Sequence, residues 1–118
     1  MARLQPVLRP LLLSSLFAVG ALAWRTALAD DATVVELSLR DHRFSPTELR
    51  VPAGRPVVVN VRNEDSTPEE FDSKALKVEK VIAGKKSASV RIRSLDKGRY
   101  PFVGEYHEGT ARGVVIAE

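Results

Sequence analysis

Short runs of alternating apolar and polar side chains fill the chain from residue 33 onward. Alternation with a period of two is typical of β-strands, whose successive side chains point to opposite faces. The run at 57–61 is the most apolar, so we expect it to be a central strand. Further runs that predict strands lie at 33–39, 48–51, 77–82, 87–92, 99–103 and 113–117. No segment keeps a long 3.6-residue period, and 69–76 has room for one helical turn.

Turn signals separate these runs at intervals of about ten residues, which is typical of all-β sandwiches and barrels. They combine proline, glycine and charged residues at 44–46, 52–54, 83–86 and 96–98. The turn at 83–86 lies between two strand-like runs, so we expect 77–82 and 87–92 to pair around it. The pattern therefore predicts an all-β fold without internal repeats.

The first 29 residues have the pattern of a secretory signal peptide. Arg3 and Arg9 give a basic start, an apolar stretch covers 11–23, and Ala-Leu-Ala at 27–29 supplies a cleavage signal. This apolar stretch is short for a membrane span, although an uncleaved anchor remains the alternative. We therefore predict a signal peptide at 1–29, a single domain at 30–118 and a periplasmic location.

Charge and cysteine content narrow the function classes. The chain has 18 Lys and Arg against 15 Asp and Glu. Arg3, Arg9 and Arg25 lie in the predicted signal peptide, so the remaining 15 basic residues balance the 15 acids. No basic cluster with aromatics is present, and we expect no nucleic-acid partner. Since the chain has no cysteine, a small exported domain must be stabilised by packing or by a metal.

The C-terminal segment 98–113 is the best candidate for chemistry. His107, one of two histidines in the chain, lies between Glu105 and Glu108 on a stretch with glycines at 104, 109 and 113. Imidazole and carboxylate groups on a glycine-flanked loop are good ligands for copper, iron or zinc. A solvated loop histidine is the alternative interpretation. No serine lies near a histidine in a nucleophile motif, which argues against hydrolytic catalysis.

Two stretches resemble the cupredoxins, small copper proteins with a Greek-key β-sandwich fold. They are FSPTELRVPAGRPVVVNVRNEDSTPEEF at 44–71 and GRYPFVGEYHEGTARGVVIAE at 98–118. In blue-copper members the second stretch carries a Cys, a His and usually a Met. Here His107 stands in place of the His, Gly104 in place of the Cys and Ala111 roughly in place of the Met. The resemblance therefore implies an all-β, cupredoxin-like sandwich without a thiolate–copper site.

The resemblance also implies a set of metal ligands. Glu70 occupies the place of the upstream histidine, and with Phe71 buried we expect it to turn toward the loop end; Glu69 and Asp72 compete for this role. Glu105 is the second choice, because on an extended loop it points the same way as His107. His42 follows the first strand, and cupredoxins bring that turn near the metal; a surface histidine is the alternative. Glu79 fits a solvated face better. The predicted ligands are thus His42, Glu70, Glu105 and His107.

The chain resembles cysteine-free cupredoxins of bacterial periplasmic ferrous-iron uptake systems more closely than it resembles the blue-copper members. This resemblance implies copper (Cu²⁺) or iron as the bound metal, assistance in ferrous-iron oxidation, and as partners a periplasmic iron-binding protein and an inner-membrane iron permease. Imidazole and carboxylate ligands favour Cu(II) and iron over Cu(I). A non-enzymatic copper or iron carrier, or a metal-free interaction module, is the competing hypothesis.

Overall fold

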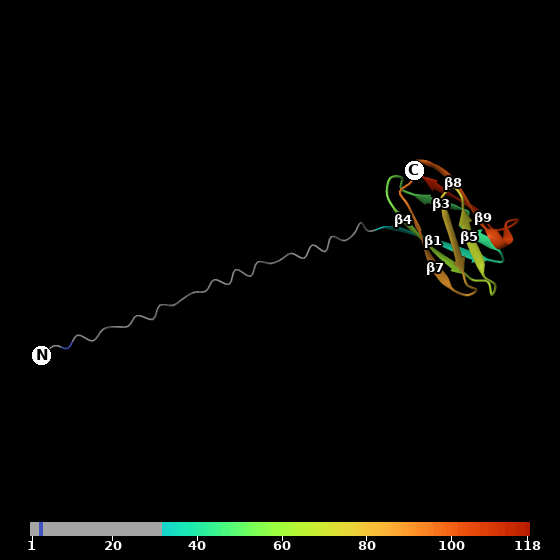
Figure 1. Cartoon of the computed structure of the whole chain (residues 1–118), viewed down its shortest axis with the longest axis horizontal. Helices are drawn as coiled ribbons and strands as arrows, with labels where there is room; N and C mark the ends of the chain where they lie inside the picture. Colours follow the sequence, from blue (N-terminus) through green and yellow to red (C-terminus); the bar gives the residue numbers. More distant parts are fainter. Residues whose placement is uncertain (1–2, 4–31) are drawn as a thin grey trace.

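The computed structural model describes Arg3 and residues 32–118, so most of the predicted signal peptide at 1–29 lies outside the described residues. The described chain forms nine strands and one short 3₁₀ helix, η1, at Glu105–His107 (Figure 1). This confirms the all-β class. Among the described residues, no helix is long and apolar enough to cross a membrane.

Two mixed sheets make up the fold. The four-stranded sheet has the order β2-β1-β4-β7 and the five-stranded sheet the order β3-β9-β8-β5-β6. The strands of the first sheet are β1 (Thr33–Arg40), β2 (Arg43–Ser45), β4 (Val57–Asn63) and β7 (Ser87–Ile92). Those of the second are β3 (Glu48–Val51), β5 (Glu69–Ser73), β6 (Val78–Ile82), β8 (Gly98–Gly104) and β9 (Arg112–Ala117). The prediction of a central strand at 57–61 is confirmed, because β4 pairs with β1 on one side and β7 on the other.

The expected hairpin of 77–82 with 87–92 is wrong. β6 pairs with β5 in the five-stranded sheet, and β7 pairs with β4 in the four-stranded sheet. The turn at 83–86 crosses between the sheets and packs against the loop after β4. There the backbone N–H of Lys85 donates to the carbonyl of Asp65 at 2.8 Å. A side chain at Gly84 would collide with the backbone of Ser66, so this crossing needs a glycine.

The stretch at 69–76 also differs from the expectation of one helical turn. Its first five residues form β5, with Glu69, Phe71 and Ser73 buried and the residues between them half-buried. The strand has neighbours on both sides, β6 and β8, whose backbone groups satisfy its own. Tertiary pairing therefore decides the structure where local sequence favoured neither strand nor helix.

The core fills the space between the sheets. Phe44, Phe71 and Phe102 meet there, with ring centroids 5.2 Å apart for Phe44 and Phe102 and 4.9 Å apart for Phe71 and Phe102. Both separations suit favourable aromatic pairs. Gly113 faces Phe102 across the β8–β9 pair, and a side chain there would collide with the ring. The aromatic core thus fixes how β5, β8 and β9 lie together, and β8 and β9 flank the loop that carries His107.

Candidate metal centre

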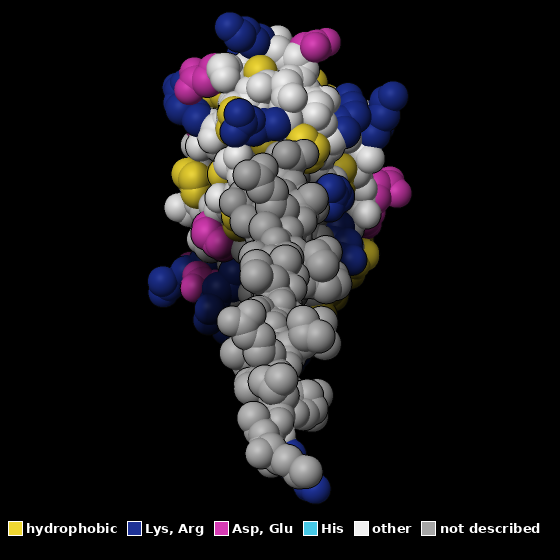
Figure 2. Space-filling view, turned by 90° about the vertical axis from the view of Figure 1, so that its left-hand side faces the viewer, with side chains coloured by type: hydrophobic (Ala, Val, Ile, Leu, Met, Phe, Trp, Pro, Cys, Tyr) yellow, Lys and Arg dark blue, Asp and Glu magenta, His cyan; other side chains and the backbone are white. Residues whose placement is uncertain are grey.

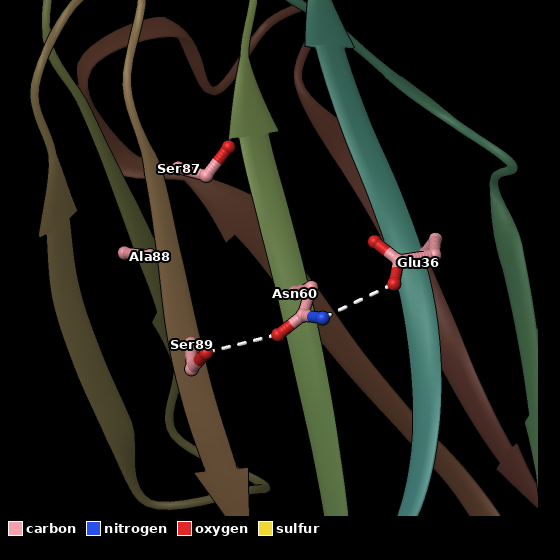
Figure 3. A pocket seen from close by; sticks show the side chains of 5 residues that line it. All are labelled: Glu36, Asn60, Ser87, Ala88 and Ser89. Atoms are coloured by element: carbon pink, nitrogen blue, oxygen red, sulfur yellow. Dashed lines mark hydrogen bonds between the residues drawn. The ribbon is translucent and has the colours of Figure 1, made fainter.

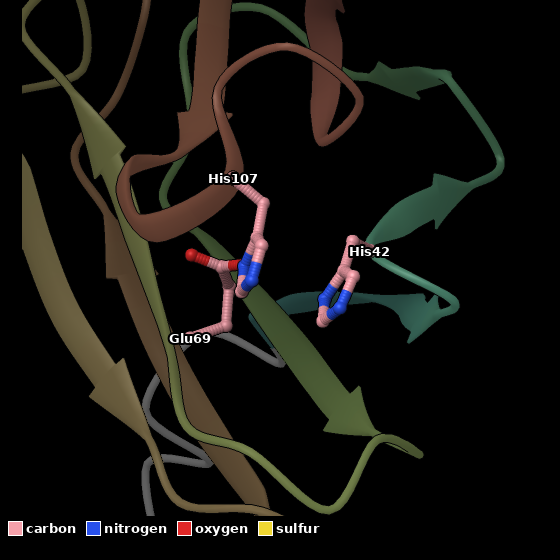
Figure 4. Close-up of side chains that lie close together, drawn as sticks. All are labelled: His42, Glu69 and His107. Atoms are coloured by element: carbon pink, nitrogen blue, oxygen red, sulfur yellow. The ribbon is translucent and has the colours of Figure 1, made fainter.

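Three side chains from separate parts of the chain meet at one end of the sandwich: His42, Glu69 and His107 (Figure 4). His42 lies in the turn between β1 and β2, Glu69 begins β5, and His107 ends η1. One ligand atom from each lies within 4.8 Å of the others.

Figure 2 views the molecule from the side at the left of Figure 1, and no histidine side chain is visible on that face. Acidic and basic side chains are interspersed there.

Glu69 is the buried member of this centre, with 1% of its surface exposed. Its Oε1 accepts hydrogen bonds from the backbone N–H groups of Tyr106 (2.9 Å) and Glu70 (3.1 Å). Its Oε2 lies 2.6 Å from Nδ1 of His107. A buried carboxylate is costly unless it is hydrogen-bonded, and here three donors serve its two oxygens. Glu69 thereby ties β5 to the histidine loop.

Gly104 makes the space that the Glu69 side chain fills. It pairs with Phe71 across the β5–β8 ladder. A Cβ atom at Gly104 would lie 2.7 Å from Cδ of Glu69 and 2.7 Å from Cβ of Ala111, closer than real Cβ contacts. Gly104 stands in place of the cysteine of blue-copper proteins. The space that a side chain at this position would take is filled by the Glu69 carboxylate from the neighbouring strand β5.

His42 comes from a two-residue turn in which Asp41 (φ 49°) and His42 (φ 56°) both have positive φ. Asp65 accepts hydrogen bonds from both of their backbone N–H groups, at 2.7 Å and 3.0 Å. The imidazole of His42 stacks on that of His107, with ring centroids 3.5 Å apart and planes inclined by 13°. The turn therefore presents His42 to the His107–Glu69 pair.

The structure brings together two of the four predicted ligands, His42 and His107. The other two, Glu70 and Glu105, belong to a different group with Glu79, whose ligand atoms lie within 4.8 Å of one another. Hydrogen bonding and charge repulsion from Glu70 raise the pKa of Glu105 above its usual value, with smaller contributions from burial and other acids. Glu70 is half-buried, and Glu79 and Glu105 are exposed, whereas Glu69 is buried.

Glu69 was a competitor for the upstream position in the sequence interpretation, and the structure places it beside His107 instead of Glu70. The reason is strand parity. Glu69 and Phe71 are two residues apart on β5 and therefore point to the same, inward side, whereas Glu70 points outward. Burial of Phe71, which the sequence did indicate, was the signal for Glu69. Asp65 was not foreseen, because its role depends on a backbone turn.

The donor set fits a metal that takes nitrogen and oxygen ligands. Two imidazoles and one carboxylate suit Cu(II), iron or zinc, whereas soft sites for Cu(I) need sulfur. The chain has no cysteine, and its single methionine is Met1. Imidazole nitrogens bind in the plane of the ring, so the stacked rings must turn before both can contact one ion. The described residues therefore fit such a metal in ligand type, with a change in the histidine stack.

A second concave region lies on the outer face of the four-stranded sheet (Figure 3). It measures about 320 Å³ and is lined by Glu36, Asn60, Ser87, Ala88 and Ser89. Its polar groups bond one another: Ser89 Oγ donates to Asn60 Oδ1 (2.9 Å), and Asn60 Nδ2 donates to Glu36 Oε1 (3.1 Å). With one carboxylate and no imidazole, it offers a poor donor set for a metal.

Comparison with known proteins gives the family. The model of the family described as "Cupredoxin-like domain" matches residues 12–117. An uncharacterised protein of Rickettsia prowazekii is 32% identical over 87 residues, which cover 74% of this chain and 70% of that protein.

Solved structures show the same fold at low sequence identity. Auracyanin A, a "blue" copper protein of Chloroflexus aurantiacus, superposes with a TM-score of 0.63 at 15% identity, covering 74% of this chain and 99% of that one. A purple cupredoxin of Nitrosopumilus maritimus gives a TM-score of 0.56 at 16% identity over 71% of this chain and 99% of that one. The expected cupredoxin-like sandwich is thus confirmed, and the chain belongs to the cupredoxin-like domain family.

Proposed function

We propose that this protein is an exported metal-binding protein that holds Cu(II) at His42, Glu69 and His107. The observation that carries the proposal is the buried Glu69 carboxylate, whose Oε2 lies 2.6 Å from Nδ1 of His107, with the imidazole of His42 stacked alongside. Divalent copper binds nitrogen and oxygen donors more tightly than the other common first-row divalent metals. Copper is also supported by the fold shared with auracyanin A, a "blue" copper protein.

Each residue has a separate role in this proposal. Glu69 supplies a buried negative charge, since it is 1% exposed, beside two histidines whose side chains are 41% (His42) and 29% (His107) exposed. His107 is held by that carboxylate and by η1, whereas His42 reaches the site from the turn between β1 and β2. A copper ion bound there would supply one-electron redox chemistry. The protein residues determine how the ion is held and how far solvent reaches it.

We further propose that the bound metal assists ferrous-iron oxidation in the periplasm before iron passes to a membrane permease. The signal-peptide pattern at 1–29 supports the location. Exposed and half-buried carboxylates of Glu70, Glu79 and Glu105 next to the histidine loop support an encounter with iron, because carboxylate oxygens bind Fe(III) more strongly than Fe(II) and so favour oxidation. A periplasmic iron-binding protein would be the donor or acceptor of the iron. A carrier that binds copper or iron without catalysis is the second candidate.

The test is direct metal analysis of the exported protein, followed by calorimetric titration of the metal-free form with Cu(II). Wild type should bind one ion, and His107→Ala should lose tight binding. Glu48→Gln is the control, since Glu48 is exposed on β3 and pairs with Arg50 away from the histidines. Oxygen uptake with Fe(II), with and without copper, then separates an oxidase from a carrier. Equal Cu(II) affinity of wild type and His107→Ala would overturn the assigned site.

A further inference from the structure

The turn that carries His42 is unfavourable by sequence. Two-residue turns with positive φ at both positions strongly prefer Asn-Gly or Asp-Gly, because glycine adopts such angles without steric cost. Here Asp41 and His42 adopt φ values of 49° and 56°, and neither is a glycine. Residues held in sparsely populated backbone regions persist only where surrounding contacts determine them. The contacts that hold this turn therefore decide where the His42 imidazole lies.

Asp65 provides those contacts from the loop after β4. Its Oδ1 accepts from the N–H of Asp41 at 2.7 Å, and its Oδ2 accepts from the N–H of His42 at 3.0 Å. The same Oδ2 lies 3.4 Å from Nδ1 of the His42 ring. A carboxylate at Nδ1 favours a proton on that nitrogen, which leaves Nε2 free for a metal. One side chain thus sets both the backbone and the ring of His42.

Asp65 is itself held in place by the protein interior. Its backbone N–H donates to Oδ1 of Asn63 at 3.0 Å, and its carbonyl accepts from the N–H of Lys85 at 2.8 Å. Asn63 is 1% exposed, and its Nδ2 donates to the carbonyl of Thr67 at 2.8 Å. Asp65 is therefore held in place as the acceptor for the turn.

We propose that Asp65 is a positioning residue for the metal centre: it holds the 41–42 turn so that His42 faces His107, without contacting the metal. This inference rests on the proposed function, because it assigns His42 to the site as a ligand. It predicts that the Asp65 carboxylate controls metal affinity entirely through His42. Outer partners of metal-ligating histidines typically change metal affinity by about 10–100-fold when removed.

The experiment compares Asp65→Ala and Asp65→Asn with wild type in Cu(II) titrations of the exported protein. We expect Asp65→Ala to bind roughly 10–100-fold more weakly. The Cu(II) affinity of Asp65→Asn should fall between those of wild type and Asp65→Ala, since an amide has one oxygen to accept from two N–H groups. Asp65→Asn also tests the inference if Asp65→Ala does not fold. The matched control is Glu64→Gln, on the same loop, whose carboxylate contacts Arg62 and not the turn. It should bind as wild type does.

Two further readouts separate positioning from general stability. In a His42→Ala background, Asp65→Ala should cause no additional loss of Cu(II) affinity, because its effect passes through His42. In the metal-free protein, NMR should show contacts between the His42 and His107 rings in wild type and their loss in Asp65→Ala. An undiminished loss of affinity in the His42→Ala background, or a stack that persists in Asp65→Ala, would overturn the inference.

The NMR measurement also keeps this inference distinct from the proposed function. If wild type does not bind Cu(II), the proposed function fails, while the effect of Asp65 on the His42–His107 stack is still measured. If wild type binds Cu(II) and the Asp65 variants bind equally well, the site stands and the role of Asp65 is wrong.

Discussion

Replacement of Glu69 by glutamine gives the sharpest test of the buried carboxylate. Glutamine has nearly the same shape, so no cavity forms. Its single amide oxygen can still accept from the N–H groups of Tyr106 and Glu70, which now contact Oε1. The group opposite Nδ1 of His107 becomes a neutral NH₂ donor instead of Oε2, so the imidazole must carry its proton on Nε2 for this hydrogen bond to form. The substitution therefore removes the charge and leaves the packing.

The expected cost follows from the three hydrogen bonds. Bonds to a charged group contribute about 1.5–3 kcal/mol each, against about 0.5–1.5 kcal/mol for neutral bonds. Losing the charge should thus cost about 1 kcal/mol per bond, partly offset because a neutral amide is cheaper to bury than a carboxylate. We expect a net loss of about 1–2 kcal/mol in the free energy of unfolding, or roughly 5–15 °C in Tm for a domain of this size.

The assay is thermal and chemical unfolding of metal-free protein near neutral pH, followed by Cu(II) titration. Glu70→Gln is the matched control, because Glu70 is the next residue on β5 and points to the outer face. It should not lower the Tm, because loss of its charge relieves the repulsion with Glu105. Only Glu69→Gln should lower the metal affinity, by at least the ~10–100-fold typical of lost ligand partners. If both variants unfold alike and bind copper alike, the role given to the Glu69 carboxylate is wrong.

Three further predictions concern the surroundings of the site. Gly104→Ala should lower the free energy of unfolding by about 1–3 kcal/mol through overpacking against Glu69 and Ala111. Gly109→Ala should cost much less, because a Cβ there meets nothing within 4 Å. Chemical unfolding measures both costs, and equal costs would contradict the packing argument. The raised pKa of Glu105, caused first by its hydrogen bond with Glu70, means that the folded state holds that proton more tightly than the unfolded state, whose pKa is near 4.5. Wild type should therefore lose stability relative to Glu105→Gln as the pH rises from about 4 to about 7, and parallel Tm profiles would contradict this. Copper-loaded protein should be pale, because the chain has no cysteine to give the intense charge-transfer band of a thiolate site. Absorption spectroscopy of the copper form measures this band, and a strong blue colour would contradict the ligand assignment.

Much of the fold could be predicted because strand pattern and turn chemistry agree over most of the chain. The apolar run at 57–61 and the alternation at 87–92 are strong enough to give β4 and β7 directly. What failed was pairing: 77–82 and 87–92 are adjacent in sequence but enter different sheets. A short turn permits either a hairpin or a crossing, and the choice depends on which faces bury against the core, a long-range property.

The candidate site was predicted in part for a similar reason. Histidine is rare in this chain, so His107 was identified from composition and loop context, whereas His42 was identified from the resemblance to cupredoxins. The carboxylate was ambiguous between neighbours, and only strand parity with Phe71 selects Glu69. The contribution of Asp65 depends on two positive φ angles in a turn 23 residues earlier, which residue types alone do not indicate.

The contact between Glu69 and His107 joins residues 38 positions apart in the sequence, and His42 comes from still another segment. An unfolded chain holds these groups far apart, so it has no centre to offer an ion. In the proposed function, metal capture would therefore take place in the compartment in which the chain folds and not in the one in which it is synthesised. For a chain exported unfolded, the membrane would separate these two events, and the cytoplasmic metal pool would have no part in choosing the ion.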